Sequence, residues 1–379
     1  MRTETMRRLD RWLGKISLWS GRLIAPLLSQ GPPLERRVVV TKFFGLGSLL
    51  QTYRLLDALR AEGYEVAVLT FKNNIPFGKQ MRGPVHFIPI DPSSPIRFVR
   101  SSWQAARAMN QWRPQVYLDL ELFSYYSALL GILSNAPVRV AFFSVIRPRL
   151  FYMTHRVRLN TFVHISHNYL QFARPLVAAD TFEKAARRFQ PKEIFKEIPP
   201  SDCSAPYVVF APYGSDTLGG LKIWPNGHWR RLAMLLTKKH PQVKIFIVGA
   251  PSDLAESEKL TQAINHPNVE NLVGRTSLDA LFRLLAHAAL TIAIDSFPFH
   301  LSTLLGRPTI GLFGPETPVH YGPGDQPRSV ALTAGVHCSP CINIYAGKVS
   351  ELACTNNVCL QQILPEQVMQ TIETHGWPA

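Results

Sequence analysis

The chain has 379 residues, of which 46% are hydrophobic and 18% are charged, a balance that indicates folded domains and excludes a disordered protein. Its formal net charge of +15 favours acidic partners, such as phosphorylated substrates, anionic lipids or nucleic acids. No apolar run reaches the length of about 18 residues that a spanning helix needs, and no secretory signal is evident, so we expect a cytoplasmic protein.

Residues 1–29 are predicted to form a basic amphipathic helix that is separate from the globular body. Apolar and basic side chains recur at helical spacing on different faces of this segment, a pattern typical of a helix lying in a membrane interface. The alternative is a helix packed on the protein's own surface. The apolar set is Leu9, Trp12, Leu13, Ile16, Trp19 and Leu23, and the basic set is Arg8, Arg11, Lys15 and Arg22.

Strands alternate with helices along residues 37–175, which predicts a first Rossmann-like domain with a parallel sheet. A strand at 38–40 leads through a glycine turn at 44–48 into a helix over 49–60. Further strands are expected at 66–69, 86–90, 116–120 and 138–143, and further helices over 95–112 and 125–133.

The same alternation returns over residues 206–364 and predicts a second Rossmann-like domain. Residues 176–205 are mixed and charged and are interpreted as the connection between the domains. A last helix within 365–379 is expected to cross back to the first domain, and a cleft between the two domains is the default ligand site. Strands are expected at 207–211, 244–248, 270–273, 290–294 and 309–313, and helices over 228–239, 253–264, 278–288 and 297–305.

Polar residues gather at the end of the strand 290–294. Asp295 and Ser296 follow that strand directly and precede a short helix. Ligands of open α/β sheets bind at this edge, and a carboxylate, a hydroxyl and a helix N-terminus suit sugar hydroxyls and phosphate. The alternative interpretation is that the two residues only cap the helix.

Four segments together resemble glycosyltransferase family 9, the heptosyltransferases of lipopolysaccharide assembly, over about residues 37–375. They occur in the family's order with the expected fold pattern between them. They are the turn Gly45-Leu46-Gly47, the loop Lys222-Ile223-Trp224-Pro225, Asp295-Ser296 with Pro298 and His300, and Phe313-Gly314-Pro315 with Thr317-Pro318.

The resemblance implies a GT-B fold, in which two Rossmann-like domains face a cleft, and an inverting transfer from a sugar nucleotide such as ADP-heptose. It implies a lipopolysaccharide-core or other lipid-linked acceptor, work at the cytoplasmic face of the inner membrane, and neither a cofactor nor a catalytic metal. The basic N-terminal helix agrees with a peripheral membrane location. A nucleic-acid partner is not expected, because no nucleic-acid-binding motif accompanies the positive charge.

The resemblance also assigns roles at the donor site. Lys222 matches the family's phosphate-binding lysine, and Ser215 in the same loop is a further hydroxyl donor. Asp295 matches the aspartate that holds the donor sugar, and Ser296 matches a phosphate contact. His300 is interpreted either as a site residue or as a helix-packing histidine.

One position of the third motif departs from the family pattern. Phe297 stands where the family usually has glycine, whose missing side chain lets backbone approach a phosphate closely.

The general base is a second departure from the family pattern. Heptosyltransferases carry an aspartate directly after the glycine turn, where this chain has Ser48. A serine needs a partner to act as a base, so we predict Glu121 or Asp119 as the substitute, with capping or salt bridging as the alternative. Together, Ser48 and Phe297 motivate a second hypothesis, a catalytically silent protein that binds a sugar nucleotide.

Two further predictions concern the second domain. Gly249 ends a strand, and Asp253 or Glu256 beyond it is expected to reach a ribose hydroxyl. Four cysteines spaced as C-x2-C-x12-C-x4-C are a possible structural zinc site, with reduced thiols or oxidation-dependent disulfides as the alternatives. These cysteines are Cys338, Cys341, Cys354 and Cys359.

Overall fold

The computed structural model divides the chain into two compact units, Met1–Arg188 and Phe189–Ala379. It describes residues 3–78, 80–83, 85–143, 147–187, 194–196, 198, 205–214, 220–342 and 354–377.

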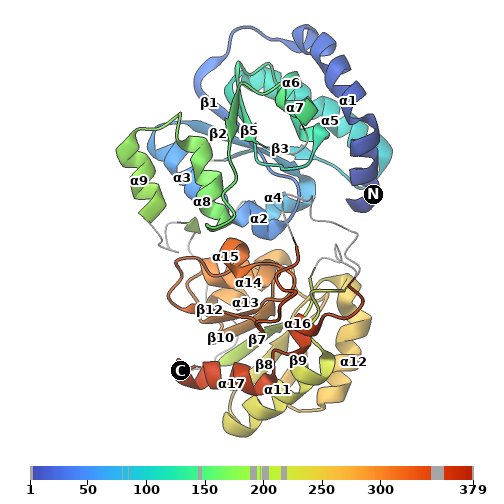
Figure 1. The fold of residues 1–379 in the computed structure, drawn as a ribbon, viewed down its shortest axis with the longest axis vertical. Coiled ribbons are helices and arrows are strands. Elements are labelled where there is room, and N and C mark those ends of the chain that lie inside the picture. Colours follow the sequence, from blue (N-terminus) through green and yellow to red (C-terminus); the bar gives the residue numbers. More distant parts are fainter. Residues whose placement is uncertain are drawn as a thin grey trace. The chain divides into compact units, whose positions relative to one another are not determined.

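The first unit is built on a six-stranded parallel sheet with the order β3-β2-β1-β4-β5-β6 (Figure 1). Its strands are β1 (Leu34–Thr41), β2 (Glu65–Phe71), β3 (His86–Ile90), β4 (Pro114–Asp119), β5 (Val138–Phe142) and β6 (His155–Val157). Its helices are α1 (Thr3–Leu28), α2 (Leu46–Leu50), α3 (Tyr53–Ala61), α4 (Ile75–Gly78), α5 (Pro95–Trp112), α6 (Tyr125–Leu133), α7 (Arg147–Leu150), α8 (Ile165–Leu170) and α9 (Ala179–Arg187).

The second unit repeats this plan with the order β12-β11-β10-β7-β8-β9, again in parallel. Its strands are β7 (Tyr207–Ala211), β8 (Lys244–Ile247), β9 (Val269–Asn271), β10 (Leu290–Ile294), β11 (Thr309–Leu312) and β12 (Ser329–Leu332). Its helices are α11 (Asn226–Lys239), α12 (Leu254–Ile264), α13 (Leu278–His287), α14 (Phe297–Leu304), α15 (Pro318–Tyr321), α16 (Val358–Gln361) and α17 (Pro365–Thr374).

Numbered within its own unit, each sheet has the strand order 3-2-1-4-5-6 of a Rossmann fold. The predicted fold class, α/β with two Rossmann-like units, is therefore confirmed. The central strands β7 and β10 are buried on both faces, as their unbroken apolar runs predict for parallel strands covered by helices.

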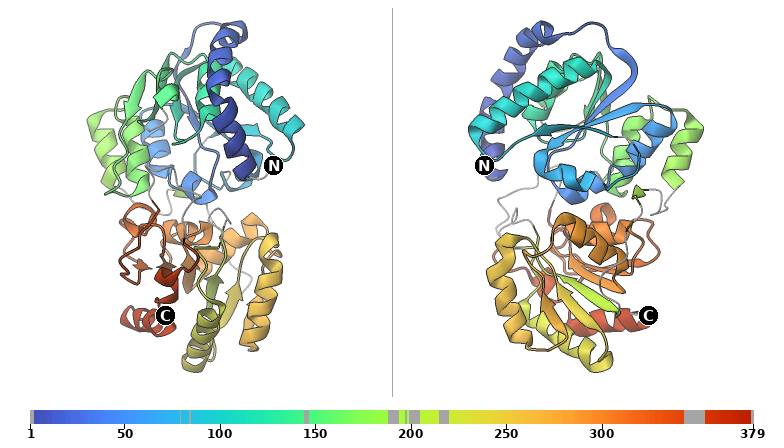
Figure 2. Two further views of the ribbon diagram at one scale, coloured as in Figure 1. Left: turned by 45° about the vertical axis from the view of Figure 1, so that its right-hand side comes forward. Right: turned by 180° about the vertical axis from the view of Figure 1, so that it is seen from behind.

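Helix α1 is part of the first unit, which corrects the expectation of a separate N-terminal segment. It packs along α6 so closely that a Cβ on Gly14 would lie 2.3 Å from the Tyr125 ring, and one on Gly21 would lie 2.3 Å from Leu129. The backbone amide of Tyr125 donates to the Asp10 carboxylate over 2.9 Å, so this aspartate caps the start of α6. Figure 2 shows α1 lying against the helical layer of this unit.

Three further boundaries differ from the sequence predictions. The helix expected over 49–60 is two helices, because Thr52 closes a tight turn through its hydroxyl on the Leu49 carbonyl at 2.7 Å. Helix α9, within the predicted connection 176–205, belongs to the first unit, where the carbonyls of Ala185 and Ala186 accept from Arg54. Helix α17 does not cross back, because its apolar face joins the core of the second unit against α11.

Candidate functional site

The loop that carries Lys222 is held in place by a buried tryptophan. Trp224 is fully buried, and its Nε1 donates to the carbonyl of Ile363 over 2.9 Å. From the same C-terminal segment, Asn357 Nδ2 donates to the carbonyl of Ile223 over 2.7 Å. The backbone next to the lysine is therefore fixed by the core, which gives the lysine-x-tryptophan-proline spacing a physical reason.

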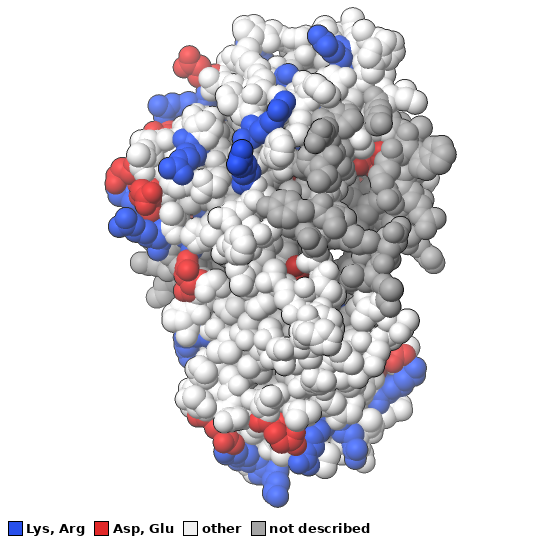
Figure 3. All heavy atoms as spheres, viewed as in Figure 1, with Lys and Arg blue, Asp and Glu red and all other residues white. Residues whose placement is uncertain are grey.

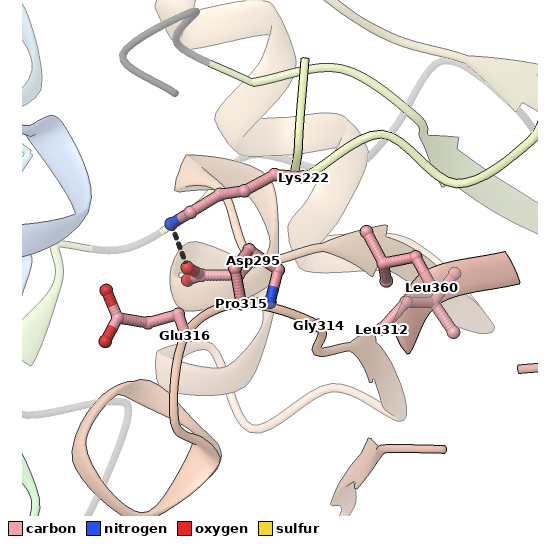
Figure 4. A pocket seen from close by; sticks show the side chains of 7 residues that line it. All are labelled: Lys222, Asp295, Leu312, Gly314, Pro315, Glu316 and Leu360. Carbon is pink, nitrogen blue, oxygen red and sulfur yellow. Dashed lines mark hydrogen bonds and ion pairs between the residues drawn. The ribbon is translucent and has the colours of Figure 1, made fainter. Parts of the chain in front are cut away.

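Lys222 and Asp295 form an ion pair at the carboxyl ends of β7 and β10. The lysine Nζ donates to Asp295 Oδ2 (Figure 4). The His300 Nε2 lies 3.4 Å from Oδ1 of the same carboxylate. Burial alone raises the pKa of Asp295, but the charges and hydrogen bonds of Lys222 and His300 outweigh it and hold this pKa well below its usual range. The carboxylate is therefore ionised at neutral pH, and His300 lies at the site.

A small pocket opens beside this pair. Its lining residues come from the lysine loop, the ends of β10 and β11, the loop after β11 and α16 (Figure 4). At Gly314 an added Cβ would lie 2.7 Å from Leu360, so only glycine allows the pocket wall to approach α16 this closely. The lining residues are Lys222, Asp295, Leu312, Gly314, Pro315, Glu316 and Leu360.

Glu316 is a site residue that the sequence analysis missed. Its side chain is nearly fully buried, lines the pocket, and presents its carboxylate on the side of Lys222 and Asp295 (Figure 4). The available signal was a carboxylate placed inside the Gly-Pro-x-Thr-Pro segment directly after a buried strand.

Ser296 has a buried hydroxyl with no hydrogen-bond partner among the residues that the structure describes. It occupies the N-cap position of α14, yet its side chain caps no amide of that helix. Gly214 approaches it closely, since an added Cβ there would lie 3.3 Å from Ser296 Cβ. An unsatisfied buried hydroxyl at a helix start is suited to bind a ligand oxygen.

The first turn of α14 offers fewer amide donors than the family motif. Phe297 is half-buried at its first position, and Pro298 follows without an N–H group. The phenylalanine therefore replaces a glycine at a point where little backbone is available to a phosphate.

The remaining donor-side predictions are only partly addressed by the structure. Ser215 lies outside the described residues. Asp253 accepts from the Ala250 amide over 2.8 Å and closes the turn after Gly249, while Glu256 pairs with Lys259 on the surface at 2.6 Å. A ribose contact by either carboxylate stays a prediction.

In the first unit, Glu121 holds the turn that follows β1. Its Oε1 accepts from Lys42 Nζ at 2.8 Å and from the backbone amides of Phe43 at 2.7 Å and Phe44 at 3.2 Å. The lysine and the glutamate are both buried. Because the carboxylate holds one lysine and two backbone amides in place, this geometry favours the alternative interpretation of Glu121 as a salt-bridging residue over a general base.

Asp119 is also engaged by protein partners. It accepts from Arg149 Nη2 at 3.0 Å, from Ser127 Oγ at 2.9 Å and from the Glu121 amide at 3.0 Å, and none of its side chain is exposed. Burial raises its pKa to about 6, although Arg149 and the hydrogen bonds oppose this shift. A fully buried carboxylate has no access to an acceptor, so its geometry also favours the structural alternative.

The glycine turn places Ser48 at the start of α2. Gly45 has a φ of 82°, which favours glycine, and Gly47 is buried within the helix. Ser48 is half-buried, and a Cβ on Gly45 would lie 3.2 Å from its Oγ. The turn is thus shaped as predicted, while the role of the serine stays a prediction.

All four C-terminal cysteines are free thiols. Burial, and then the neighbouring thiols, raise the pKa of Cys341 and of Cys359, which shows that the sulfurs lie near one another. Within the described ranges, no group of three or more His, Cys, Asp or Glu side chains is arranged to hold a metal ion. The structural zinc site therefore stays a prediction without geometric support.

In the part of the chain that the structure describes, no helix is both long enough and apolar enough to cross a bilayer.

Comparison with known proteins identifies a family whose model matches the chain. The family model of glycosyltransferase family 9 (heptosyltransferase) matches residues 118–346. Lipopolysaccharide heptosyltransferase 1 of Pseudomonas aeruginosa is 26% identical over 186 residues, which cover 47% of this chain and 50% of that protein. The chain thus spans about half the length, or less, of the curated relatives it matches.

Two solved structures share the fold over most of the chain. A glycosyl transferase family 9 structure from Veillonella parvula has a TM-score of 0.73 and 20% identity, covering 91% of this chain and 98% of that one. The ADP-heptose lipopolysaccharide heptosyltransferase II of E. coli has a TM-score of 0.68 and 18% identity, with coverages of 89% and 98%.

Proposed function

Because the chain belongs to glycosyltransferase family 9, we propose that it is an inverting glycosyltransferase that uses a sugar nucleotide, with ADP-heptose as the leading donor. The acceptor is a lipopolysaccharide-core or other lipid-linked glycan. The observation that carries this proposal is the ion pair of Lys222 and Asp295 at one pocket, with His300 on the same carboxylate and the unsatisfied hydroxyl of Ser296 next in the chain.

The chemistry of the pocket supports a diphosphate leaving group. Glycosyl transfer develops negative charge on the diphosphate, and a fixed cation stabilises that charge. Lys222 supplies the cation, and the Ser296 hydroxyl supplies a donor to a phosphate oxygen. Asp295, kept ionised by its partners, accepts from sugar hydroxyls, and His300 fixes its orientation.

Transfer is expected to need no added divalent cation. In this proposal the charge that a metal would neutralise is met by Lys222. Full turnover in the presence of a chelator is the expected result, and recovery of a lost rate by one added metal would contradict it.

Glu316 extends the donor site toward the sugar. Diphosphate is repelled by carboxylates, so the two carboxylates of the pocket are better suited to hydroxyl groups than to phosphate. Asp295 and Glu316 line the same pocket. We therefore assign Glu316 to recognition of a donor-sugar hydroxyl.

A turnover assay tests the proposed function. The purified full chain is incubated with ADP-heptose and heptose-deficient lipopolysaccharide, and the product is identified by mass spectrometry. Transfer by the wild type, with loss in Asp295→Asn, is expected; wild-type rates in that variant would refute the site. UDP- and GDP-sugars in parallel reactions identify the nucleotide.

A silent sugar-nucleotide-binding protein remains the second hypothesis because Phe297 and Pro298 reduce the donors at the start of α14. Calorimetric binding of the donor, without transfer or donor hydrolysis in the same preparation, would favour it.

Helix α1 supports a location at the membrane surface. Its inner face contacts α6, yet the apolar stripe identified from spacing points outward: Ile16 is 68%, Trp19 64% and Leu23 59% exposed. A helix stabilised only by its own protein would bury such a stripe. An outward tryptophan-containing stripe next to basic residues is typical of an interfacial helix.

The membrane role of α1 is better tested by point substitution than by deletion of residues 1–29. Deletion would uncover the α6 surface on which the buried Leu18 and Ala25 pack. The double variant Trp19→Gln, Leu23→Gln leaves that inner face intact and is expected to move the protein from membrane to soluble fractions. An unchanged membrane share would count against the proposal.

A further inference from the structure

Helix α5 has a second apolar stripe that its role in the fold does not explain. Its inner face buries Ala105, Ala106 and Met109. On its outer side Ile96 is 82%, Val99 68% and Trp103 47% exposed, at a spacing that places the three side chains on one face. A helix that covers a sheet needs one apolar face, so the outer stripe requires another explanation.

Helix α5 is a neighbour of α1. The two helices contact each other, and both contact α6. Both views of Figure 2 show α1 and α5 side by side on the same helical layer. Two neighbouring helices thus each expose apolar side chains to solvent.

The charge around α5 selects the class of partner. Arg97, Arg100 and Arg107 are exposed on this helix, which contains no Asp or Glu. Residues 1–188 contain 27 Lys and Arg against 11 Asp and Glu, whereas residues 189–379 contain 14 against 15. The positive charge of the protein therefore belongs to the first unit.

The surface reflects this division. On the face drawn in Figure 3, several basic side chains in the middle of the first unit stand on uncharged surface, while basic and acidic side chains lie side by side at the edge of this unit and in the second unit. Pairs such as Arg231 with Glu366 and Lys239 with Glu373 account for part of that mixing.

We propose that α5 is a second membrane-binding helix, and that with α1 it forms one surface that binds an anionic lipid bilayer. This inference rests on the proposed function, since a lipid-linked acceptor requires the enzyme at a membrane. Tryptophan and isoleucine beside arginine, on a helix without acidic residues of its own, suit the boundary between acyl chains and anionic headgroups. Arg97 follows Ile96 and Arg100 follows Val99, an arrangement that a stripe made for a protein partner would not require.

Vesicle binding of the full chain tests the proposal. Cosedimentation is measured with phosphatidylcholine vesicles that contain or lack phosphatidylglycerol. The variant Ile96→Gln, Val99→Gln is expected to lower partitioning into both by about tenfold, because two largely exposed side chains lose their burial in lipid. The variant Arg97→Gln, Arg100→Gln is expected to lower partitioning only into anionic vesicles, by roughly fivefold per charge.

Phe162→Gln is the matched control. Phe162 is 87% exposed in the same unit, but it precedes α8, which packs on α3. Its substitution is expected to leave vesicle binding unchanged. Turnover of a water-soluble acceptor by the α5 variants is also expected to stay at the wild-type rate, which shows that they fold.

The outcomes separate this inference from the proposed function. Wild-type vesicle binding by both α5 variants, while the α1 variant Trp19→Gln, Leu23→Gln loses it, overturns the role of α5. A change in oligomeric state instead of vesicle binding shows a protein interface and also overturns it. If vesicle binding follows the prediction but no acceptor receives a sugar, the proposed function is wrong and the membrane-binding surface is supported.

Discussion

The two units place the same pair of charges at the same point of their sheets. In the first unit Lys42 follows β1 and Glu121 follows β4, and they form an ion pair of 2.8 Å. In the second unit Lys222 lies in the loop after β7 and Asp295 follows β10, and they also pair. In both sheets these are the central neighbouring strands, where ligands of Rossmann folds bind.

The partners of each pair differ. Glu121 also accepts two backbone amides, and its pair with Lys42 is closed within the turn after β1. Lys222 reaches Asp295 from a much longer loop, keeps 22% of its side chain exposed, and lines a pocket. The shared topology therefore places a charge pair at this point of each sheet. The local loop determines whether that pair is enclosed in a turn or lines a pocket.

Removing the second-unit lysine gives the largest expected effect on catalysis. Lys222→Met is expected to lower kcat/KM by about 10²–10³-fold, the usual cost of one charge-stabilising donor, and also to lower thermal stability, because it leaves the buried Asp295 with His300 alone. Steady-state kinetics and a melting curve on the same sample check both parts. If Lys222→Met destabilised the fold but left the rate of the folded protein unchanged, Lys222 would have the same structural role as Lys42.

The matched change in the first unit should act on stability. Lys42→Met leaves Glu121 buried without its cation, and removing one partner of a buried pair costs about 3–5 kcal/mol; the two remaining amides favour the lower end. Urea unfolding measures the loss. If Lys42→Met were as stable as wild type but inactive, the first-unit pair would be part of the catalytic machinery.

The buried carboxylates should also respond to pH in opposite directions. Asp119 has a pKa raised to about 6 from an ordinary value of 3.8, so the folded state holds its proton between these values while the unfolded state loses it. Its contribution to stability is therefore complete below about pH 4 and falls as pH rises to about 6, by a few kcal/mol at 1.4 kcal/mol per pKa unit.

The difference in unfolding free energy between wild type and Asp119→Asn isolates this contribution. Asp295, whose pKa is lowered, stabilises the fold above its unfolded pKa and loses this effect on acidification, but it is present in both proteins and cancels. If the unfolding free energy of wild type minus that of Asp119→Asn instead grew with rising pH, Arg149 would lower the pKa of Asp119 by more than burial raises it.

The smallest expected effect concerns donor choice. Glu316→Gln is expected to lower kcat/KM for the preferred donor by about tenfold, which corresponds to one hydrogen bond to a charged acceptor. For donors that lack the recognised hydroxyl, the same variant should lower kcat/KM by less. Glu366→Gln, at an exposed ion pair of the same unit, is the control. Equal loss for all donors would assign Glu316 to pocket structure.

The sequence predicted what depends on local pattern. The alternation of strands and helices predicted both sheets. The motifs around Lys222 and Asp295 predicted the two residues that form the ion pair. Their pairing could be expected because the ends of parallel neighbouring strands meet at one edge of a sheet.

Predictions failed where a distant partner decides the outcome. Nothing in the chain order shows that Glu121 accepts from Lys42 and two amides 77 to 79 residues earlier. Likewise, spacing identified the apolar stripe of α1 but not the glycine-lined opposite face that packs on α6, because close packing of small residues carries no hydrophobic signal. Glu316 was missed because the pocket that it lines is completed by Leu360 of α16, which lies far along the chain.

The bond from Trp224 to Ile363 joins residues 139 positions apart. A ribosome must therefore add 139 residues beyond Trp224 before the loop of Lys222 is held in place. Protein cut short by a premature stop after the Gly-Pro-Glu-Thr-Pro segment would keep Lys222, Asp295 and Glu316 and still lack this bond.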